Sequence, residues 1–205
     1  MKKKLIYGNP TQASYQRVVH SELLKKMLRE NLLDSVLHVP YPEDNRAIEE
    51  VRQMISLEPD SNRMDRIIEY ENELYDCMVR FLDSYGIETS KKEIKKILST
   101  YEPIEDFLKI RYNRPRPYQF AAYYDLPLYP RLRTNASSAS YPSGHTLSSM
   151  WFRHHFMKIH PHLKSDLMDF VLDVKKSREE GGVHFPSDGA FAILVYHRMK
   201  GYFGD

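Results

Sequence analysis

Apolar residues recur at helical spacing through most of this chain, and this periodicity constrains its fold more than any other feature. One series, near the start, consists of Val18, Val19, Leu23, Leu24, Met27 and Leu28. Another consists of Met64, Ile67, Ile68, Leu74, Met78, Phe81 and Leu82. Because intervals of three and four residues place side chains on one face of a helix, both series predict amphipathic helices.

Start and stop signals support the second of these helices. Residues 60–62, Asp-Ser-Asn, precede it, and Gly86 follows it, which is the usual asymmetry of helix caps. Further helices are predicted over 91–100, 103–110, 144–158, 163–175 and 187–200. Alternating strand patterns bounded by turn signals are scarce. The sequence therefore predicts an all-α helical bundle.

The length of 205 residues favours one domain, 1–205, with a core large enough to need no disulfide or structural metal. Hydrophobic residues make up 41% of the chain, charged residues 28%, and the net charge is +2, as in ordinary soluble proteins. Cys77 is the only cysteine, so an intrachain disulfide is excluded. We expect residues 1–60, which are rich in polar turns, to form a peripheral extension, and residues 91–200 to form the functional core.

Neither a signal peptide nor a membrane span is predicted. Residues 1–4, Met-Lys-Lys-Lys, have the charge of a signal-peptide start, but a Gly-Asn-Pro turn at 8–10 follows at once and no apolar core develops. No stretch approaches the roughly 20 apolar residues that a spanning helix requires. The sequence therefore predicts a cytoplasmic protein with no membrane partner.

The first candidate motif lies in a basic segment, where Lys109 is followed seven positions later by Arg116 and Pro117. This spacing allows two cations, one from a helix end and one from a proline-stiffened loop, to converge on a single anion. Interleaved arginine and tyrosine are equally typical of nucleic-acid binding or of a solvated loop. The segment alone leaves these alternatives open.

The second motif, at 141–146, is a tight turn that runs into an apolar helical segment. Unsatisfied backbone N–H groups at a helix start attract anions, and Gly144 allows a ligand to approach the main chain closely. Ser143 adds a hydroxyl donor, and His145 lies where an imidazolium could protonate a leaving oxygen. The alternative is that Ser143 is only a helix cap and His145 a surface residue.

The third motif joins Arg178 and His184, in a loop predicted at 177–186, with Asp188, in the helix predicted at 187–200. Pro186 suits the first turn of a helix, so Asp188 is expected about one turn beyond His184. A carboxylate on Nδ1 of His184 would fix the tautomer and leave Nε2 as a nucleophile. The alternative pairs Arg178 with a neighbouring glutamate and makes His184 a mere cap.

Taken together, the three motifs resemble the type 2 phosphatidic acid phosphatase superfamily. This superfamily includes bacterial class A nonspecific acid phosphatases and vanadium haloperoxidases, and the resemblance is closest in kind to the soluble acid phosphatases. The positions that carry it are Lys109, Arg116, Pro117, Pro142, Ser143, Gly144, His145, Ser177, Arg178, His184 and Asp188. They span roughly 80 residues of the C-terminal half. The resemblance implies a helical bundle of the acid phosphatase and vanadium haloperoxidase type.

The resemblance also implies a phosphate site. Lys109, Arg116 and Arg178 would neutralise the equatorial oxygens of a bound phosphate, or of vanadate as its mimic. Ser143 and the amide of Gly144 would complete the cradle. No metal and no cofactor are implied.

The same resemblance assigns the chemistry. His184 would be the nucleophile, Asp188 would orient it, and His145 would be the general acid and base. The predicted function is metal-independent hydrolysis of small phosphate monoesters through a phosphohistidine, with nucleotides among the candidates. We expect a pH optimum on the acidic side of neutral, because His145 must be protonated and His184 neutral.

Two other functions remain open at this stage. A vanadate-dependent haloperoxidase would use the same cradle, with His184 as the axial ligand of vanadate. A non-enzymatic phosphate or nucleic-acid binding module would use Arg111, Arg114, Arg116, Arg131 and Arg133. The near-neutral net charge argues against a broad nucleic-acid footprint, so the expected partner is a small phosphorylated substrate. Homo-oligomer formation is left open.

Overall fold

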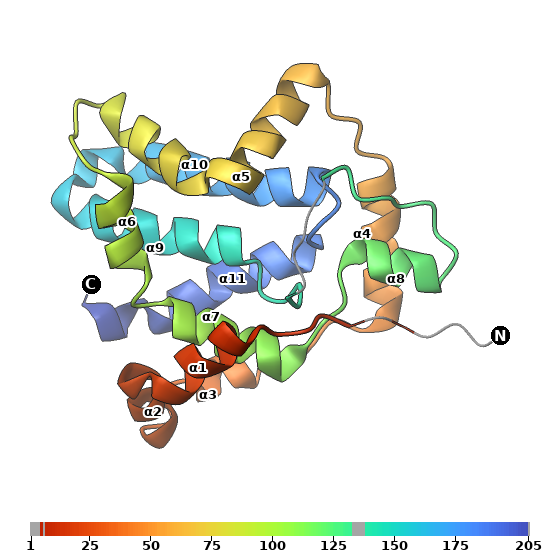
Figure 1. The fold of residues 1–205 in the computed structure, drawn as a ribbon, viewed down its shortest axis with the longest axis horizontal. Coiled ribbons are helices and arrows are strands. Elements are labelled where there is room, and N and C mark those ends of the chain that lie inside the picture. Colours follow the sequence, from red (N-terminus) through yellow and green to blue (C-terminus); the bar gives the residue numbers. More distant parts are fainter. Residues whose placement is uncertain (1–4, 6, 133–137, 205) are drawn as a thin grey trace.

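The computed structural model describes residues 5, 7–132 and 138–204, and within these ranges the fold is all-α with no strand (Figure 1). This confirms the predicted fold class. The α-helices are α1 (Gln12–His20), α2 (Glu22–Arg29), α3 (Asp34–Leu37), α4 (Asp44–Ile55), α5 (Ser61–Asp83), α6 (Lys91–Leu98), α7 (Glu102–Tyr112), α8 (Pro117–Tyr123), α9 (Gly144–Ile159), α10 (Lys164–Glu180) and α11 (Pro186–Met199). Two short 3₁₀ helices, η1 (Pro161–Leu163) and η2 (Lys200–Phe203), follow α9 and α11.

The predicted helices correspond to α5, α6, α7, α9, α10 and α11. The caps of α5 act as expected. The Asp60 side chain accepts a hydrogen bond from the Arg63 amide at 2.8 Å, and Gly86 adopts a φ of 70° just beyond the end of the helix. A left-handed φ of this kind favours glycine, so the stop signal has a direct conformational cause.

The structure differs from the predicted elements at three places. The first apolar series is divided into α1 and α2 because the Ser21 side chain accepts from the Leu24 amide and starts a new helix. Helices α3, α4 and α8 lie where no helix was predicted. Helix α10 runs on to Glu180, so Arg178 lies in its last turn and not in the predicted loop.

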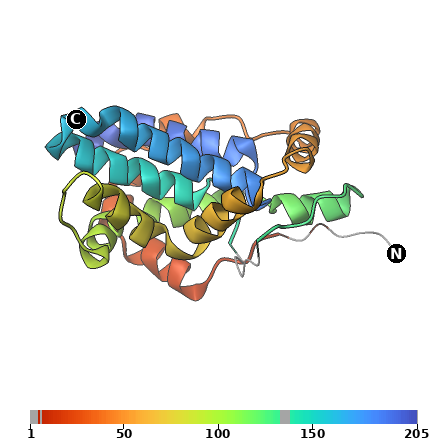
Figure 2. The same cartoon turned by 90° about the horizontal axis from the view of Figure 1, so that it is seen from above.

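Helix α9 lies at the centre of the bundle, and α10 and α11 pack against it. Figure 2 shows these three helices side by side, with α5, α6 and α7 forming the other side of the bundle. Met150, Trp151 and Phe152 of α9 are buried in consecutive positions, which means that the helix is enclosed around most of its circumference. This enclosure holds the first turn of α9 firmly at the centre of the molecule.

Residues 1–60 are more closely integrated than the predicted peripheral extension. Leu24 and Met27 of α2, Leu33 at the start of α3 and Val36 within α3 are part of the main hydrophobic core. Helix α4 packs against α8 and forms a second cluster at one end of the molecule (Figure 2). The physical reason is that both segments carry apolar faces, which become stable only when they are covered.

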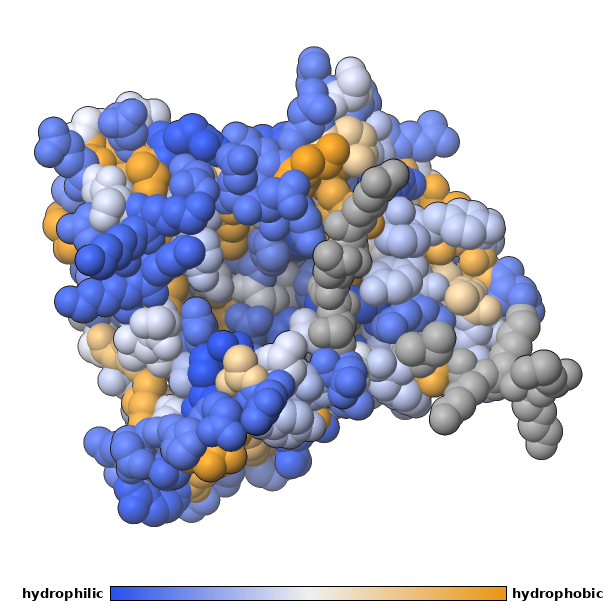
Figure 3. All heavy atoms as spheres, in the orientation of Figure 1, coloured by the Kyte–Doolittle hydropathy of each residue, from blue (hydrophilic) through white to orange (hydrophobic). Residues whose placement is uncertain are grey.

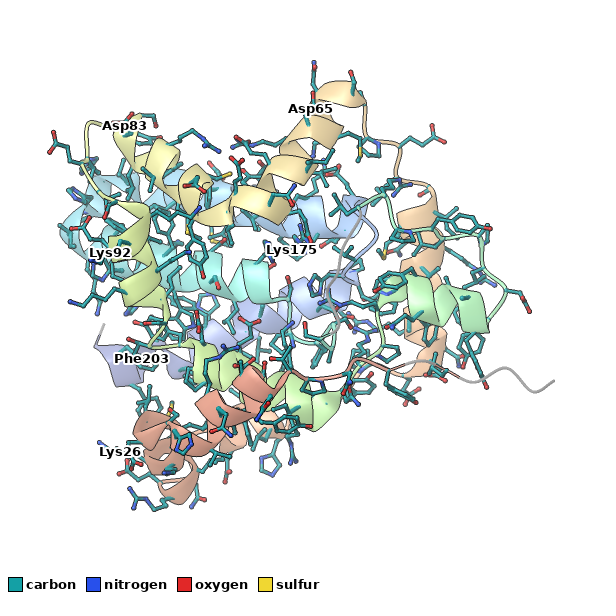
Figure 4. The ribbon with its side chains drawn as sticks, viewed as in Figure 1. Lys26, Asp65, Asp83, Lys92, Lys175 and Phe203 are labelled. Atoms are coloured by element: carbon teal, nitrogen blue, oxygen red, sulfur yellow. The ribbon has the colours of Figure 1, made fainter. Side chains whose placement is uncertain are left out.

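The outer surface is largely polar. Lys26, Asp65, Asp83 and Lys92 are exposed at the margins of the molecule, away from its centre (Figure 4). None of the helices within the described ranges has the length and apolar character that crossing a bilayer demands. Residues 133–137 of the predicted serine-rich loop, including Arg133, lie outside the described residues.

Candidate active site

A cavity of about 430 Å³ opens between α5 and α7, with the first turn of α9 at its floor. Figure 3 shows a hollow with a mainly hydrophilic rim at the middle of the face drawn in Figure 1. Six of the eight predicted site residues line the cavity, namely Lys109, Arg116, Gly144, His145, Arg178 and His184. Asp188 lies behind His184, and Ser143 lies behind Gly144. The fold therefore brings the three sequence motifs together.

Three helices supply the cations. Lys109 lies in the last turn of α7, Arg116 caps the start of α8, and Arg178 lies in the last turn of α10. Asn113 ends α7 in a left-handed conformation with a φ of 43°, so the chain reverses between Lys109 and Arg116. This reversal is what allows two cations seven positions apart to face the same cavity.

Burial lowers the pKa of each of these three cations. Removal from water lowers the pKa of Lys109 to about 8, although the nearby Glu105 carboxylate acts in the opposite direction. Burial likewise lowers the pKa of Arg116 and of Arg178. Both guanidinium groups keep their charge because arginine titrates far above neutral pH. A buried cluster of positive charge is costly by itself, and a bound anion would offset that cost.

Arg178 has unused hydrogen-bonding capacity. Its side chain is 3% exposed, and its Nη2 donates to a carboxylate oxygen of Glu71. Its Nε and Nη1 are buried and have no partner among the described residues. Buried donors are almost always satisfied in proteins. An oxyanion ligand would satisfy both groups at once.

His184 has a defined tautomer. Its Nδ1 lies 2.8 Å from the carbonyl oxygen of Ser140 and 3.2 Å from a carboxylate oxygen of Asp188, so Nδ1 carries the proton and donates it. The opposite nitrogen, Nε2, accepts from Nη1 of Arg116 at 2.9 Å and therefore bears the lone pair. Burial, followed by the neighbouring cations, holds the pKa of His184 well below its usual range. The ring is thus a neutral base that faces the cavity through Nε2.

Asp188 is completely buried and is held on both oxygens. One oxygen accepts from the Phe185 amide at 2.8 Å, and the other accepts from Nη1 of Arg114 at 2.6 Å. Burial raises the pKa of Asp188 to about 6, and the Arg114 cation acts against this increase. At neutral pH the carboxylate is therefore ionised and able to orient His184.

Behind Asp188 lies a buried polar network that the sequence analysis missed. Arg114 is 2% exposed, donates to Ser187 Oγ at 2.7 Å, and approaches a Glu50 oxygen at 3.4 Å. Glu50, from α4, accepts from the Ser187 amide at 3.0 Å and from its hydroxyl at 2.6 Å. Each charge in this network has a partner, which is the condition under which buried charges are tolerated. The network ties the N-terminal region to the base of the site.

Ser143, Gly144 and His145 occupy the start of α9. The Ser143 hydroxyl oxygen accepts from the Thr146 hydroxyl at 3.0 Å, and the Ser143 amide donates to the Asp188 carbonyl at 3.1 Å, so this side chain caps the helix and does not line the cavity. A Cβ at position 144 would come within 2.2 Å of a Glu105 carboxylate oxygen. A larger residue here would therefore require the Glu105 side chain to move, whereas glycine leaves its carboxylate in place.

His145 lines the cavity beside the three cations. Burial, followed by the charges of Arg178, Lys109 and Arg116, holds the pKa of His145 well below its usual range. In the free site the ring is therefore neutral at physiological pH. A bound phosphate dianion would offset the cationic surroundings and favour the protonated ring.

The cavity also contains carboxylates that the sequence analysis did not single out. Glu71 comes from α5, immediately before a kink at Glu73, where φ is −135° and ψ is 30°. Glu102, Glu105 and Asp106 come from α7. No short motif marks these positions, because their role depends on how α5 and α7 pack.

The five arginines of the alternative binding module do not form one exposed surface. Arg114 and Arg116 are buried, and Arg131 donates to the carbonyls of Glu180 and Leu57. Arg111 is exposed, and Arg133 lies outside the described residues. Within the described part of the chain, no group of three or more His, Cys, Asp or Glu side chains is arranged to hold a metal ion.

Comparison with known proteins found similarity to solved structures only. No family model and no curated protein sequence matches the chain. Among solved structures, the chain is similar to a transmembrane PAP2-type phosphatidylglycerolphosphate phosphatase from Bacillus subtilis. The sequence identity is 17%, the TM-score is 0.40, and the alignment covers 93% of this chain and 92% of that one.

The cytoplasmic location and the lack of a membrane partner predicted from the sequence are therefore withdrawn: the chain is similar to a protein described as transmembrane, its described helices include none that could span a membrane, and neither finding assigns a compartment. The prediction was drawn from missing signal and spanning segments, and such an absence does not assign a compartment.

Proposed function

We propose that this chain is a phosphatase that hydrolyses small phosphate monoesters through a phosphohistidine at His184, without a metal ion. One observation carries the proposal. The lone pair of His184 Nε2 faces a cavity lined by three buried cations, while Asp188 holds the opposite ring nitrogen. A fixed nucleophile beside a concentrated positive charge is what attack on a phosphate ester requires.

In the first step, the lone pair of His184 Nε2 attacks phosphorus in line with the leaving oxygen. The P–N bond forms as the P–O bond to the alcohol breaks, and His145 donates its proton to the departing alkoxide. Arg116 must turn its Nη1 from Nε2 to a phosphate oxygen as the substrate binds. Asp188 stabilises the positive charge that develops on the ring.

In the second step, water attacks phosphorus and the P–N bond breaks. His145, now neutral, takes a proton from this water, and the lone pair returns to Nε2 of His184. Inorganic phosphate leaves the cavity. Throughout both steps, Lys109, Arg116 and Arg178 stabilise the equatorial oxygens, the role that Mg²⁺ performs in many phosphoryl-transfer enzymes.

The direct test is a phosphate-release screen in the presence of EDTA. p-Nitrophenyl phosphate, nucleotides, sugar phosphates and pyrophosphate would each be incubated with the protein, and a His184→Ala variant would be run in parallel. We expect phosphate release from at least one monoester by the wild-type protein only. Vanadate-dependent halide oxidation without phosphate release would replace the proposal with the haloperoxidase function.

His145→Gln is expected to slow hydrolysis in proportion to how poor the leaving group is. Loss of general acid catalysis typically costs ~10²–10⁴ in rate, and alkyl phosphates should show this full loss because alkoxides need a proton to depart. p-Nitrophenolate needs little help, so its release should be much less affected. Single-turnover rates on both esters measure the difference, and equal losses on both would remove His145 from the role of general acid.

The dependence of kcat/KM on pH is expected to be bell-shaped, with its maximum between about pH 6 and 8. Activity should fall below about pH 6 as Asp188 becomes protonated, and above about pH 8 as Lys109 loses its charge. This maximum lies above the acidic optimum expected from the sequence, because burial lowers the pKa of Lys109 and raises that of Asp188.

Lys109→Arg provides the control for this profile. Arginine keeps its charge, so the decline above pH 8 should disappear even if the absolute rate is lower. If kcat/KM of the wild-type protein stayed constant up to pH 9, the assignment of Lys109 as the group that must be charged would be contradicted.

A further inference from the structure

Positive and negative side chains are balanced in the cavity. The cations that line it are Arg17, Lys109, Arg116 and Arg178, and the carboxylates are Glu71, Glu102, Glu105 and Asp106. A site that only has to bind a phosphate dianion needs a surplus of positive charge. The carboxylates therefore call for a chemical explanation.

Two of the carboxylates are satisfied at the rim. Arg17 donates to Asp106 at 2.6 Å, and its Nε lies 3.6 Å from an oxygen of Glu102. Arg17 comes from α1 and is not one of the cations predicted to bind phosphate. Glu102 and Asp106 therefore keep their partner when a substrate binds.

The other two carboxylates are paired with phosphate-binding cations. Glu71 accepts a hydrogen bond from Arg178, and Glu105 lies 3.6 Å from Nζ of Lys109. The side chains of Glu71 and Glu105 are only 16% and 23% exposed. Burial raises the pKa of Glu105, which shows that its environment already disfavours the charge.

A separate observation places a ligand next to them. Arg178 is 2% exposed, lines the cavity, and has two buried donors, Nε and Nη1, without a partner among the described residues. When phosphate binds there and at Lys109, it shares these cations with Glu71 and Glu105, because Glu71 keeps its contact with Nη2 of Arg178. The two cations then face a phosphate dianion in addition to two largely buried carboxylates, and this uncompensated negative charge is costly.

On the basis of the proposed function, we infer that the preferred substrates are phosphate monoesters whose alcohol carries a primary ammonium group, received by Glu71 and Glu105. The ammonium group would compensate this negative charge. Because each carboxylate contacts a cation that binds the phosphate, the ammonium must lie close to phosphorus, as it does on a two-carbon alcohol. The simplest such ester is 2-aminoethyl phosphate.

The test compares two esters that differ in one group. In propyl phosphate a methyl group replaces the ammonium group of 2-aminoethyl phosphate, with the same chain length. The ratio of kcat/KM for the two esters would be measured for the wild-type protein and for Glu71→Gln, Glu105→Gln and the double variant. The two alcohols differ in acidity, but this difference contributes the same factor in every protein and cancels between variants.

We expect the ratio to fall at least about tenfold in each single variant and further in the double variant, because a hydrogen bond to a charged group is worth about that factor. Glu102→Gln is the matched control. It removes a carboxylate that lines the same cavity but is paired with Arg17, and its ratio should stay within about twofold of the wild-type value. Glu71 and Glu105 lie on different helices, so misfolding of one variant leaves the other as a test.

The outcomes separate this inference from the function on which it rests. Hydrolysis of p-nitrophenyl phosphate together with an unchanged ratio in both variants would overturn the inference and leave the phosphatase function standing. An equal gain in kcat/KM for both esters in Glu71→Gln would also overturn it, because the carboxylate would then only compete with phosphate. If the wild-type protein released phosphate from none of the esters, both the inference and the phosphatase function would be overturned.

Discussion

Replacing His184 with alanine is expected to abolish turnover of every phosphate ester, with a loss of about four orders of magnitude or more. Among the described residues that line the cavity, this ring alone is held by a carboxylate on one nitrogen and has a lone pair on the other. No water held in its place would have both the nucleophilicity and the orientation of Nε2. The measurement is steady-state phosphate release, with a single-turnover assay to detect residual activity.

The loss must be separated from misfolding, because His184 is 3% exposed and bonded on both nitrogens. Thermal unfolding of His184→Ala would be followed by circular dichroism, and His184→Gln would serve as a second variant that keeps polar atoms in the pocket. The wild-type protein would also be reacted with a ³²P-labelled ester and quenched rapidly without acid. This reaction should yield a phosphoprotein that is labile in acid and stable in alkali. Normal turnover by a folded His184→Ala protein would refute the assignment.

Asp188→Asn is expected to reduce kcat by about 10³–10⁴-fold, the loss seen when the carboxylate that orients a catalytic histidine is neutralised. Asparagine no longer stabilises the charge that forms on His184. Asparagine also places an NH₂ group where one of the two carboxylate oxygens of Asp188 lies. That NH₂ group cannot accept the hydrogen bond that the Phe185 amide or Arg114 donates at this position. The decline in kcat/KM below about pH 6 should disappear, because the group that titrates there is removed.

Asp173→Asn is the matched control for this variant. Asp173 lies on α10, is bonded to Arg63 at 2.5 Å and to the Tyr70 hydroxyl at 2.7 Å, and does not line the cavity. Its replacement should lower the unfolding temperature without a comparable loss of kcat. If Asp188→Asn kept its kcat within tenfold of the wild-type value, Asp188 would not orient the nucleophile.

Helical periodicity was sufficient to predict most of the bundle. The apolar series after residue 60 and its caps predicted α5, because burial of one helix face and satisfaction of the helix ends are local consequences of sequence. The prediction was wrong where a helix cap or tertiary packing outweighed the apolar periodicity. Ser21 interrupts a continuous apolar pattern with a cap, and α10 continues past 175 because Val174, Ser177 and Arg178 are buried by tertiary packing.

The active-site motifs could also be predicted, because each works over a short distance along the chain. His184 lies just before α11 and Asp188 lies in its first turn, so the start of this helix places the carboxylate beside the ring. Gly144 at the start of α9 and the Lys109 to Arg116 spacing follow the same logic. The sequence alone therefore predicted the fold class, the cavity residues that we propose to bind phosphate, and the proposed nucleophile, whereas Ser143 caps α9 outside the cavity.

Only the tertiary structure decided what surrounds them. Arg178 meets Glu71 across 107 positions, and Glu50 reaches Ser187 across 137. Such pairs depend on how helices distant in sequence pack together, for example α5 against α10, and packing is a collective result of burial with no signature at either residue. The positions of the cations and of the nucleophile thus follow from short spacings along the sequence. The carboxylates that would select the leaving group come from helices distant in sequence, because apolar packing brings those helices to the cavity.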